Sequence, residues 1–182
     1  MTLTNIEIKA KSSEEEQNKI IGILKQKNAK YLGADVQTDT YFKIETGRLK
    51  LRRGNIENSL IYYEREDKKD SKQSDVILFD NQGRINELEE IMKKTHDILV
   101  IVEKKRNIYF IENVKFHIDN VSRLGRFIEI EAISKDKILP IEKLQEQCNY
   151  YKTLLGIEDR NLIKNSYGDM LIEENKNDRN NK

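Results

Sequence analysis

The chain has 182 residues, a length that suits one domain with a sizeable core. Lysine and arginine total 33 and aspartate and glutamate total 32, so the net charge of +1 gives no sign of a nucleic acid or an acidic membrane as partner. The single cysteine excludes an internal disulfide, and a charged N-terminal segment and the lack of a long apolar run predict a cytoplasmic protein without a membrane span.

Alternation of polar and apolar residues predicts strands along most of the chain. Residues 3–11 form the first of them, with Glu7 and Lys9 on its polar face. Ser12 and Glu15 fit a capping box, so a helix should follow directly. Further strands are predicted at residues 36–42, 48–53, 59–66, 76–79, 98–110, 114–121 and 127–134.

Helices are predicted at three later places. Residues 86–94 form a short helix between two strands. Pro140 is tolerated in a first helical turn, and Gly156 stands where the helix that Pro140 opens should end. Ser166 and Asp169 offer a second capping box before a short final helix.

The order of these elements predicts an α+β fold. Many strands follow one another through short links, whereas parallel pairs would need a helix between successive strands. An antiparallel, barrel-like sheet with helices packed outside satisfies both points. Residues 1–172 are predicted to form this single domain. Residues 173–182 are polar, lack apolar periodicity and are predicted to form a flexible tail.

Charged side chains recur on one face of several predicted strands, because side chains two positions apart point the same way. The ordinary explanation is a sheet with one face in water. Repeated arginine, which binds phosphate through paired hydrogen bonds, favours an inward-facing polar lumen instead, and two carboxylates on one face can hold a hard cation such as Mg²⁺. The sets are Glu7, Lys9 and Lys11; Arg48, Lys50 and Arg52; Arg65; Lys104 and Arg106; His117 and Asp119; and Glu129 and Glu131.

The segment from Asn5 through Glu7 and Lys9 to Lys11 resembles the N-terminal signature of the CYTH superfamily, also called triphosphate tunnel metalloenzymes. Asn5 departs from that signature, since it stands at the position of the first glutamate and supplies an oxygen without a negative charge. The later blocks are most similar to the class IV adenylyl cyclase-like branch. They lie at residues 47–52, 60–65, 72–74, 102–109, 117–121, 124–131 and 166–171.

The resemblance implies an eight-stranded antiparallel tunnel whose charged faces point inward and hold a triphosphate such as ATP with Mg²⁺ or Mn²⁺. It implies more cations than carboxylates in the lumen, a surplus that a polyphosphate would relieve. A homodimer is plausible on the same basis. The implied catalytic residues are Lys11, Arg65 and Arg106; the substrate-binding residues are Lys9, Arg48, Lys50, Arg52, Lys72 and Lys104; and the metal ligands are Glu7, Asp119, Glu129 and Glu131.

Three functions remain open at this point. The first is a class IV adenylyl cyclase-like enzyme that converts ATP to cyclic AMP and pyrophosphate. The second is a hydrolase of inorganic, thiamine or nucleoside triphosphate. The third is a non-catalytic module that binds polyphosphate or nucleotide, which Asn5 keeps in consideration. No residue stands out as a general base; His117 is predicted to form structural hydrogen bonds beside Asp119, and Cys148 to pack in the interior.

Overall fold

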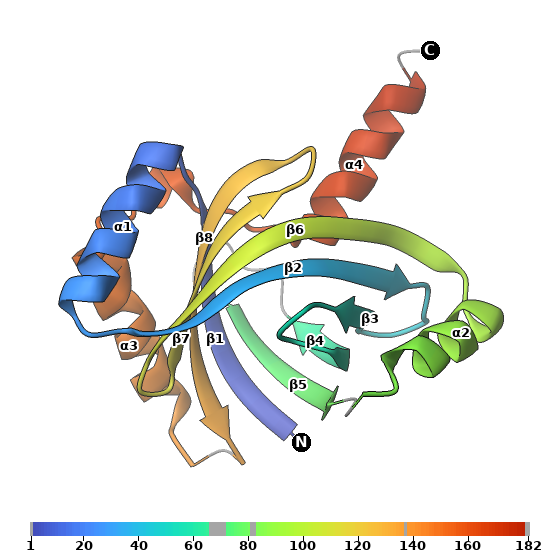
Figure 1. The fold of residues 1–182 in the computed structure, drawn as a ribbon, viewed down its shortest axis with the longest axis horizontal. Helices are drawn as coiled ribbons and strands as arrows, with labels where there is room; N and C mark the ends of the chain where they lie inside the picture. The colour runs from blue at the N-terminus through green and yellow to red at the C-terminus, as the bar shows by residue number, and fades with distance from the viewer. Residues whose placement is uncertain (1, 66–71, 81–82, 137, 181–182) are drawn as a thin grey trace.

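Eight antiparallel strands close into a barrel in the computed structural model, which describes residues 2–65, 72–80, 83–136 and 138–180 (Figure 1). The strands are β1 (Thr2–Lys11), β2 (Lys30–Phe42), β3 (Arg48–Arg53), β4 (Ser59–Arg65), β5 (Lys72–Asp80), β6 (Ile98–Ile111), β7 (Val114–Val121) and β8 (Gly125–Lys135). Around the barrel they follow the order β1-β5-β4-β3-β2-β6-β7-β8, so β1 pairs with both β5 and β8. The predicted fold class is confirmed.

Helices lie outside the barrel, and two of them cover one flank. In Figure 1, α1 and α3 lie together beside β1, β7 and β8, and α4 projects from the region of β6. Leu24 of α1 and Leu144 and Cys148 of α3 pack with Ile6 and Ile8 of β1 in the largest apolar cluster, so the predicted burial of Cys148 is confirmed. The helices are α1 (Glu14–Gln26), α2 (Ile85–Thr95), α3 (Ile141–Leu154) and α4 (Tyr167–Asn180), with a 3-10 turn at Asp159–Asn161.

The two faces of β1 show how the sequence positions the site. Ile6 and Ile8 are 2% and 4% exposed and face outward beneath the helices, whereas Asn5, Glu7 and Lys9 face the lumen. A period of two in the strand fixes this division. The polar side chains of β1 therefore face the lumen, and its apolar side chains belong to the core between sheet and helices. Across the described residues, no helix combines the length and the apolar character needed to cross a bilayer.

The first helix begins one residue later than the capping pattern predicted. Ser12 donates its N–H to the carbonyl of Arg126 and so extends the sheet. Ser13 caps α1 instead, with Glu16 completing the capping box. Both serines precede a glutamate by three positions, so the pattern alone did not distinguish them, and the continuing strand decides.

Two strands start at least four residues earlier than the alternation predicted. β2 begins at Lys30 rather than residue 36, and β5 at Lys72 rather than residue 76. In β2, Gly33 has a φ of 137° and lies at a shift in the register with β6. This bulge interrupts the polar–apolar alternation, which explains why the first part of β2 was missed.

The final helix α4 continues through Asn180, where the sequence predicted a flexible polar tail. Arg123, in the turn between β7 and β8, lies 2.9 Å from the carboxylate of Glu174 and donates to Asn175 at 2.9 Å. These polar contacts stabilise the helix where it has no apolar stripe, and a search for apolar periodicity therefore could not detect it.

Candidate functional site

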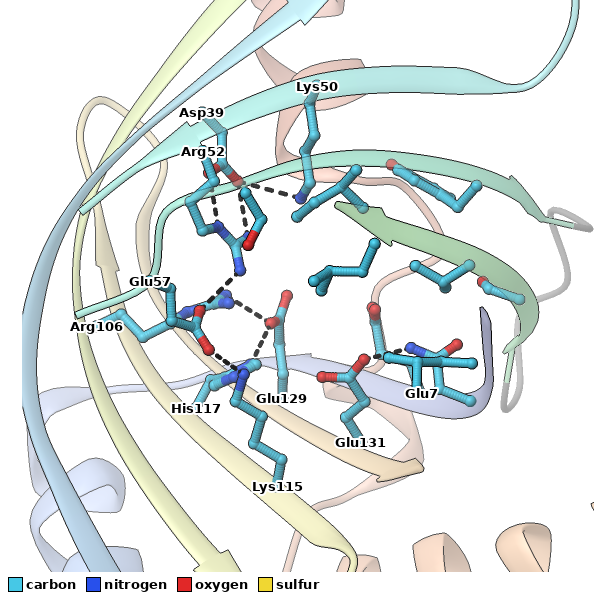
Figure 2. Close-up of a pocket in the computed structure, with 18 of the residues that line it drawn as sticks. Glu7, Asp39, Lys50, Arg52, Glu57, Arg106, Lys115, His117, Glu129 and Glu131 are labelled. Atoms are coloured by element: carbon cyan, nitrogen blue, oxygen red, sulfur yellow. Dashed lines mark hydrogen bonds and ion pairs between the residues drawn. The ribbon is translucent and has the colours of Figure 1, made fainter. Parts of the chain in front are cut away.

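The barrel encloses a cavity of about 340 Å³, shown with side chains that line it in Figure 2. One side is charged and is formed by side chains of β2, β3, β6, β7 and β8. The other side, on β4 and β5, carries an apolar surface of Ile61, Tyr63, Val76 and Leu78, with Leu3 of β1 beside them. The polar side chains of these two strands that line the cavity are Ser59, Ser74 and Asp80. Since β4 and β5 stand opposite β6 and β7 in the closed order of strands, the two surfaces face each other.

Asp39 of β2 gathers three cations on the charged side. Its carboxylate lies 2.7 Å from Lys104 Nζ and 3.1 Å from Lys50 Nζ, and it accepts two hydrogen bonds from Arg52, at 2.8 and 2.9 Å. Burial opposes ionisation of this carboxyl, but Arg52, Lys104 and Lys50 outweigh it and hold the pKa of Asp39 well below its usual value. Asp39 is thus a fixed anion that keeps these cations together.

Lys104 has a side chain that is 0% exposed. Burial lowers the pKa of Lys104 to about 7; Asp39 acts in the opposite direction, and Arg52 and Arg106 reinforce the lowering. A second anion close to this amine would favour its protonated form. A bound anion would therefore raise the fraction of Lys104 that is protonated.

Arg106 of β6 is held on two sides by carboxylates. Its Nε and Nη2 donate to Asp119 at 2.7 and 2.5 Å, and Nη2 also donates to Glu129 at 2.6 Å. Burial works against the charged guanidinium, but Asp119 and Glu129 outweigh it and raise the pKa of Arg106. The planar guanidinium of Arg106 is therefore fixed in position, and its remaining N–H donors lie at the cavity.

Lys9 connects β1 to these carboxylates and to the last helix. Its Nζ lies 3.2 Å from Glu7, 3.0 Å from Glu129 and 4.3 Å from the ring centre of Tyr167. Tyr167 is the first residue of α4, and its hydroxyl donates to Asp119 at 2.8 Å. The start of α4 therefore forms part of the cavity wall.

His117 hydrogen-bonds Glu129 rather than Asp119. Its Nδ1 lies 2.9 Å from Glu129 Oε2. Burial lowers the pKa of His117, and Arg106 and Lys115 lower it further, so the ring is mostly neutral at pH 7. Nδ1 then carries the single proton of the neutral ring and donates a hydrogen bond to the ionised carboxylate of Glu129. The structural hydrogen bond predicted for His117 is therefore present, and Glu129 is its partner.

Four charged residues that line the cavity were missed by the sequence analysis: Asp39, Glu57, Asp80 and Lys115. Glu57 lies in the connection between β3 and β4 and accepts hydrogen bonds from Arg52 Nη1 at 2.9 Å and from Lys115. Because of these additional carboxylates, the described residues that line the cavity include as many carboxylates as cations. The predicted surplus of positive charge is not found among them.

Oxygen atoms suited to a hard cation lie where β1 meets β8. Glu7 pairs with Glu131 across these strands, and Asn5 Nδ2 donates to Glu131. Asn5 Oδ1 is buried and has no hydrogen-bond partner, so an oxygen is available beside the two carboxylates. No three histidine, cysteine or acidic side chains of the described chain form a metal-binding group by themselves. Carboxylate and amide oxygens of this kind fit a hard cation such as Mg²⁺ or Mn²⁺.

A model of the CYTH domain matches residues 3–167 of this chain. The chain belongs to the CYTH family. A curated relative, “Putative adenylate cyclase” of Methanocaldococcus jannaschii, is 28% identical over 173 residues, which cover 89% of this chain and 96% of the relative.

Two solved structures share this CYTH barrel. One is a protein of Pyrococcus horikoshii OT3, with a TM-score of 0.75, 24% identity, and 91% of this chain and 98% of that chain covered. The other is a “Putative adenylyl cyclase” from Hippeastrum, described as having a dominant triphosphatase activity, with a TM-score of 0.62, 12% identity and 96% of each chain covered. At these identities, both structures establish the likeness of fold.

The CYTH barrel brings many of the predicted residues to one cavity and leaves others outside it. Lys11 is exposed at the end of β1, opposite Phe127, which is fully buried and fills the interior at that level. The side chains of Arg65 and Lys72 lie outside the described residues. The predicted residues that line the cavity are Lys9, Lys50, Arg52, Lys104, Arg106, Glu7, Glu129 and Glu131.

Arg48 and Asp119 take positions other than those predicted. Arg48 lines a smaller hollow beside α4 and lies 2.9 Å from Asp169, which also completes the predicted capping box with Ser166. Asp119 is fully buried behind Arg106, and both its oxygens accept hydrogen bonds from that guanidinium. The geometry therefore favours Asp119 as a positioning residue for Arg106 over its predicted role as a metal ligand.

Proposed function

We propose that this CYTH chain is a metal-dependent enzyme that cleaves the triphosphate of an organic substrate such as ATP inside the barrel. The observation that carries the proposal is the cluster of Lys50, Arg52 and Lys104 around Asp39, with Arg106 close by, inside the cavity of the barrel. Lysine and arginine from different strands meet there, which strand propensity does not require. Buried cations arranged in this way suit phosphate groups and stabilise charge that moves along a phosphate chain.

The apolar side of the cavity favours an organic triphosphate over inorganic triphosphate. Ile61, Tyr63, Val76 and Leu78 offer carbon surface opposite the cations, and none of the described side chains of β4 and β5 that line this side is a cation. A ligand with a polyphosphate at one end and a flat or apolar group at the other would bury both parts favourably. ATP and thiamine triphosphate both have this form, whereas inorganic triphosphate would leave the apolar side uncovered.

Formation of cyclic AMP and pyrophosphate is the leading reaction, because a relative that covers most of this chain is named “Putative adenylate cyclase”. Hydrolysis of the triphosphate is the second candidate, since a protein with the same barrel is described as mainly a triphosphatase. In both reactions the protein positions the phosphates and stabilises their charge. Arg106 is suited to this task, because Asp119 and Glu129 already fix its orientation.

Glu7 and Glu131, with the oxygen of Asn5, are the residues we assign to the metal. A divalent cation bound there would offset phosphate charge and fix the phosphate chain relative to the cations. Glu129 is engaged by Lys9, Arg106 and His117, so its principal role in this proposal is to orient those side chains.

The proposal is tested by the products of turnover. ATP, thiamine triphosphate and inorganic triphosphate are each incubated with the protein and Mg²⁺ or Mn²⁺, and products are followed by phosphorus NMR. Cyclic AMP with pyrophosphate supports the cyclase, and orthophosphate supports the triphosphatase. Binding of ATP with no turnover under any of these conditions would leave only the non-catalytic module, and absence of binding would reject the function altogether.

The metal assignment predicts that Glu131→Gln weakens Mn²⁺ binding in the presence of ATP by at least about tenfold, the lower end of what loss of even an outer-shell partner costs. The amide retains the shape of the side chain but brings no charge. Isothermal titration calorimetry measures the effect without depending on turnover. Glu103→Gln, on the exposed outer face of β6, is the control and should leave the affinity unchanged. Equal Mn²⁺ affinity in wild type and Glu131→Gln would remove Glu131 from the metal site.

A further inference from the structure

We propose that Glu57 sets the length of the phosphate chain that the cavity accepts, by holding a fixed negative charge where a longer chain would end. The inference rests on the proposed function, because it concerns the same cavity and the same cations.

Glu57 reaches the cavity from a connection between strands and not from the barrel wall. Its side chain points toward Lys115 and Arg52 in Figure 2, on the charged side of the cavity. Arg52 Nη1 donates to it at 2.9 Å, and Lys115 also donates to it. Arg52 belongs to β3 and Lys115 to β7, with β2 and β6 between these strands in the barrel order. The carboxylate of Glu57 therefore bridges separate parts of the wall.

The connection that carries Glu57 is fixed by a second buried carboxylate. Asp35 is 0% exposed and accepts hydrogen bonds from the backbone N–H groups of Ile56 and Glu57, at 2.9 and 3.0 Å. Gln37 donates to both Asp35 and Glu57, at 2.7 and 3.0 Å. Gly54 lies so close to Asp35 that a Cβ there would stand 2.5 Å from its Oδ1. These hydrogen bonds therefore hold the backbone at Glu57, and its carboxylate, in a fixed position beside the cavity.

Glu57 forms ion pairs with Arg52 and Lys115, two cations that could otherwise bind phosphate. Burial opposes its ionisation, but Lys115 and Arg52 outweigh burial and hold the pKa of Glu57 well below its usual value, so the charge persists at neutral pH. A phosphate group that reached Arg52 and Lys115 would have to lie against this carboxylate or displace it from its anchored position. Shorter chains avoid that cost by ending at Lys50 and Lys104.

The inference predicts a change in selectivity when the charge of Glu57 is removed. Binding of ADP, ATP and adenosine tetraphosphate is measured by calorimetry, with Ca²⁺ in place of Mg²⁺ to slow turnover. Wild type should bind ATP more tightly than ADP and gain nothing from the fourth phosphate. Glu57→Gln should bind the tetraphosphate about tenfold more tightly relative to ATP, the gain expected from one charge-assisted contact.

Glu89→Gln is the matched control. Glu89 also pairs with two cations, Arg53 and Lys93, both at 2.7 Å, but on the outside of the barrel. The variant makes the same change in net charge and should keep the wild-type order of affinities. If Glu57→Gln does not fold, Glu57→Gln/Lys115→Gln removes the pair together, and it should still favour the tetraphosphate relative to wild type.

The outcomes separate the two proposals. A wild type that binds none of the three nucleotides overturns the proposed function and this inference with it. A wild type that binds ATP but already gains tenfold from the fourth phosphate overturns the inference alone. The same holds if a folded Glu57→Gln, or the folded double variant, keeps the wild-type ratio of ATP to tetraphosphate affinity. A higher affinity for the tetraphosphate relative to ATP in Glu57→Gln, and not in Glu89→Gln, supports the role of Glu57.

Discussion

Arg106→Ala should lower kcat/KM for the triphosphate substrate by about a hundredfold or more, since losing one buried charge-assisted contact costs roughly 2–5 kcal/mol. Asp119 and Glu129 fix the guanidinium at the cavity, so its charge needs no reorganisation when phosphate charge moves toward the leaving group. Steady-state kinetics with ATP and inorganic triphosphate measure the loss, and thermal unfolding confirms that the variant is folded.

Two further variants distinguish the role of Arg106 from a general effect of charge. Arg106→Lys keeps the charge but lacks the planar fork, so it should recover only part of the lost kcat/KM. Arg53→Ala changes the neighbour of Arg52 on the opposite face of β3, where Arg53 pairs with Glu89, and should leave kcat/KM unchanged. Wild-type turnover in folded Arg106→Ala would place the active site outside this cavity.

Asp39→Asn is expected to have the largest effect on stability. The amide keeps the size of the side chain but leaves Lys50, Arg52 and Lys104 without their common anion. Removing one partner of a buried ion pair lowers the free energy of unfolding by about 3–5 kcal/mol. Urea unfolding at pH 7 should show a loss of that order. Asp75→Asn, on an exposed position of β5 where the carboxylate accepts one hydrogen bond from Thr4, should change little.

The pH dependence of this loss has a defined sign. The pKa of Asp39 is lowered well below 3.8 in the folded protein, so the unfolded chain takes up this proton first as the pH falls. The contribution of the ionised Asp39 to the free energy of unfolding is complete at neutral pH and is lost progressively from about pH 5 downward. The difference in stability between wild type and Asp39→Asn should therefore shrink on acidification. A difference that stayed constant between pH 7 and pH 3 would mean that Asp39 is not the ionised partner of these cations.

Triphosphate should partly restore the stability of Asp39→Asn, because its phosphates can replace the lost anion. The rise in melting temperature on adding inorganic triphosphate should be larger in the variant than in wild type, provided both bind it. An equal or smaller rise would indicate that phosphate does not approach the Asp39 cluster.

The faces of the strands could be predicted from the sequence because the period of two is a property of the strand backbone. β3 and β7 occur at the predicted residues, and their alternation places Arg52 and His117 toward the lumen as predicted. Continuing the same alternation by one step along β7 would also have found Lys115. Alternation does not show how deep a side chain lies, however: Lys11, at the end of β1, is exposed and is not among the residues that line the cavity.

The counter-charges of the cavity were harder to predict. Asp39 lies in a segment with threonines on its other face, so polarity did not distinguish the inner face of β2 from the outer one. Glu57 is not part of a strand, and no periodic rule applies to a connection that Asp35 folds back onto the barrel. The sequence therefore indicated where phosphate-binding cations would gather, but not how far the protein already neutralises them.

Closure of the barrel through β1 and β8 also has a consequence for how the chain is made. Lys11 lies opposite Phe127, so one edge of the first strand is completed by residues that leave the ribosome much later. Until then that edge keeps unpaired hydrogen-bonding groups, and the apolar face of β1 lacks Leu144 and Cys148 of α3. Pairing over such a separation is slow, because the intervening chain must first lose its freedom. We therefore expect the nascent chain to be most prone to aggregation before β8 emerges, and chaperones that bind exposed strands to act mainly in that interval.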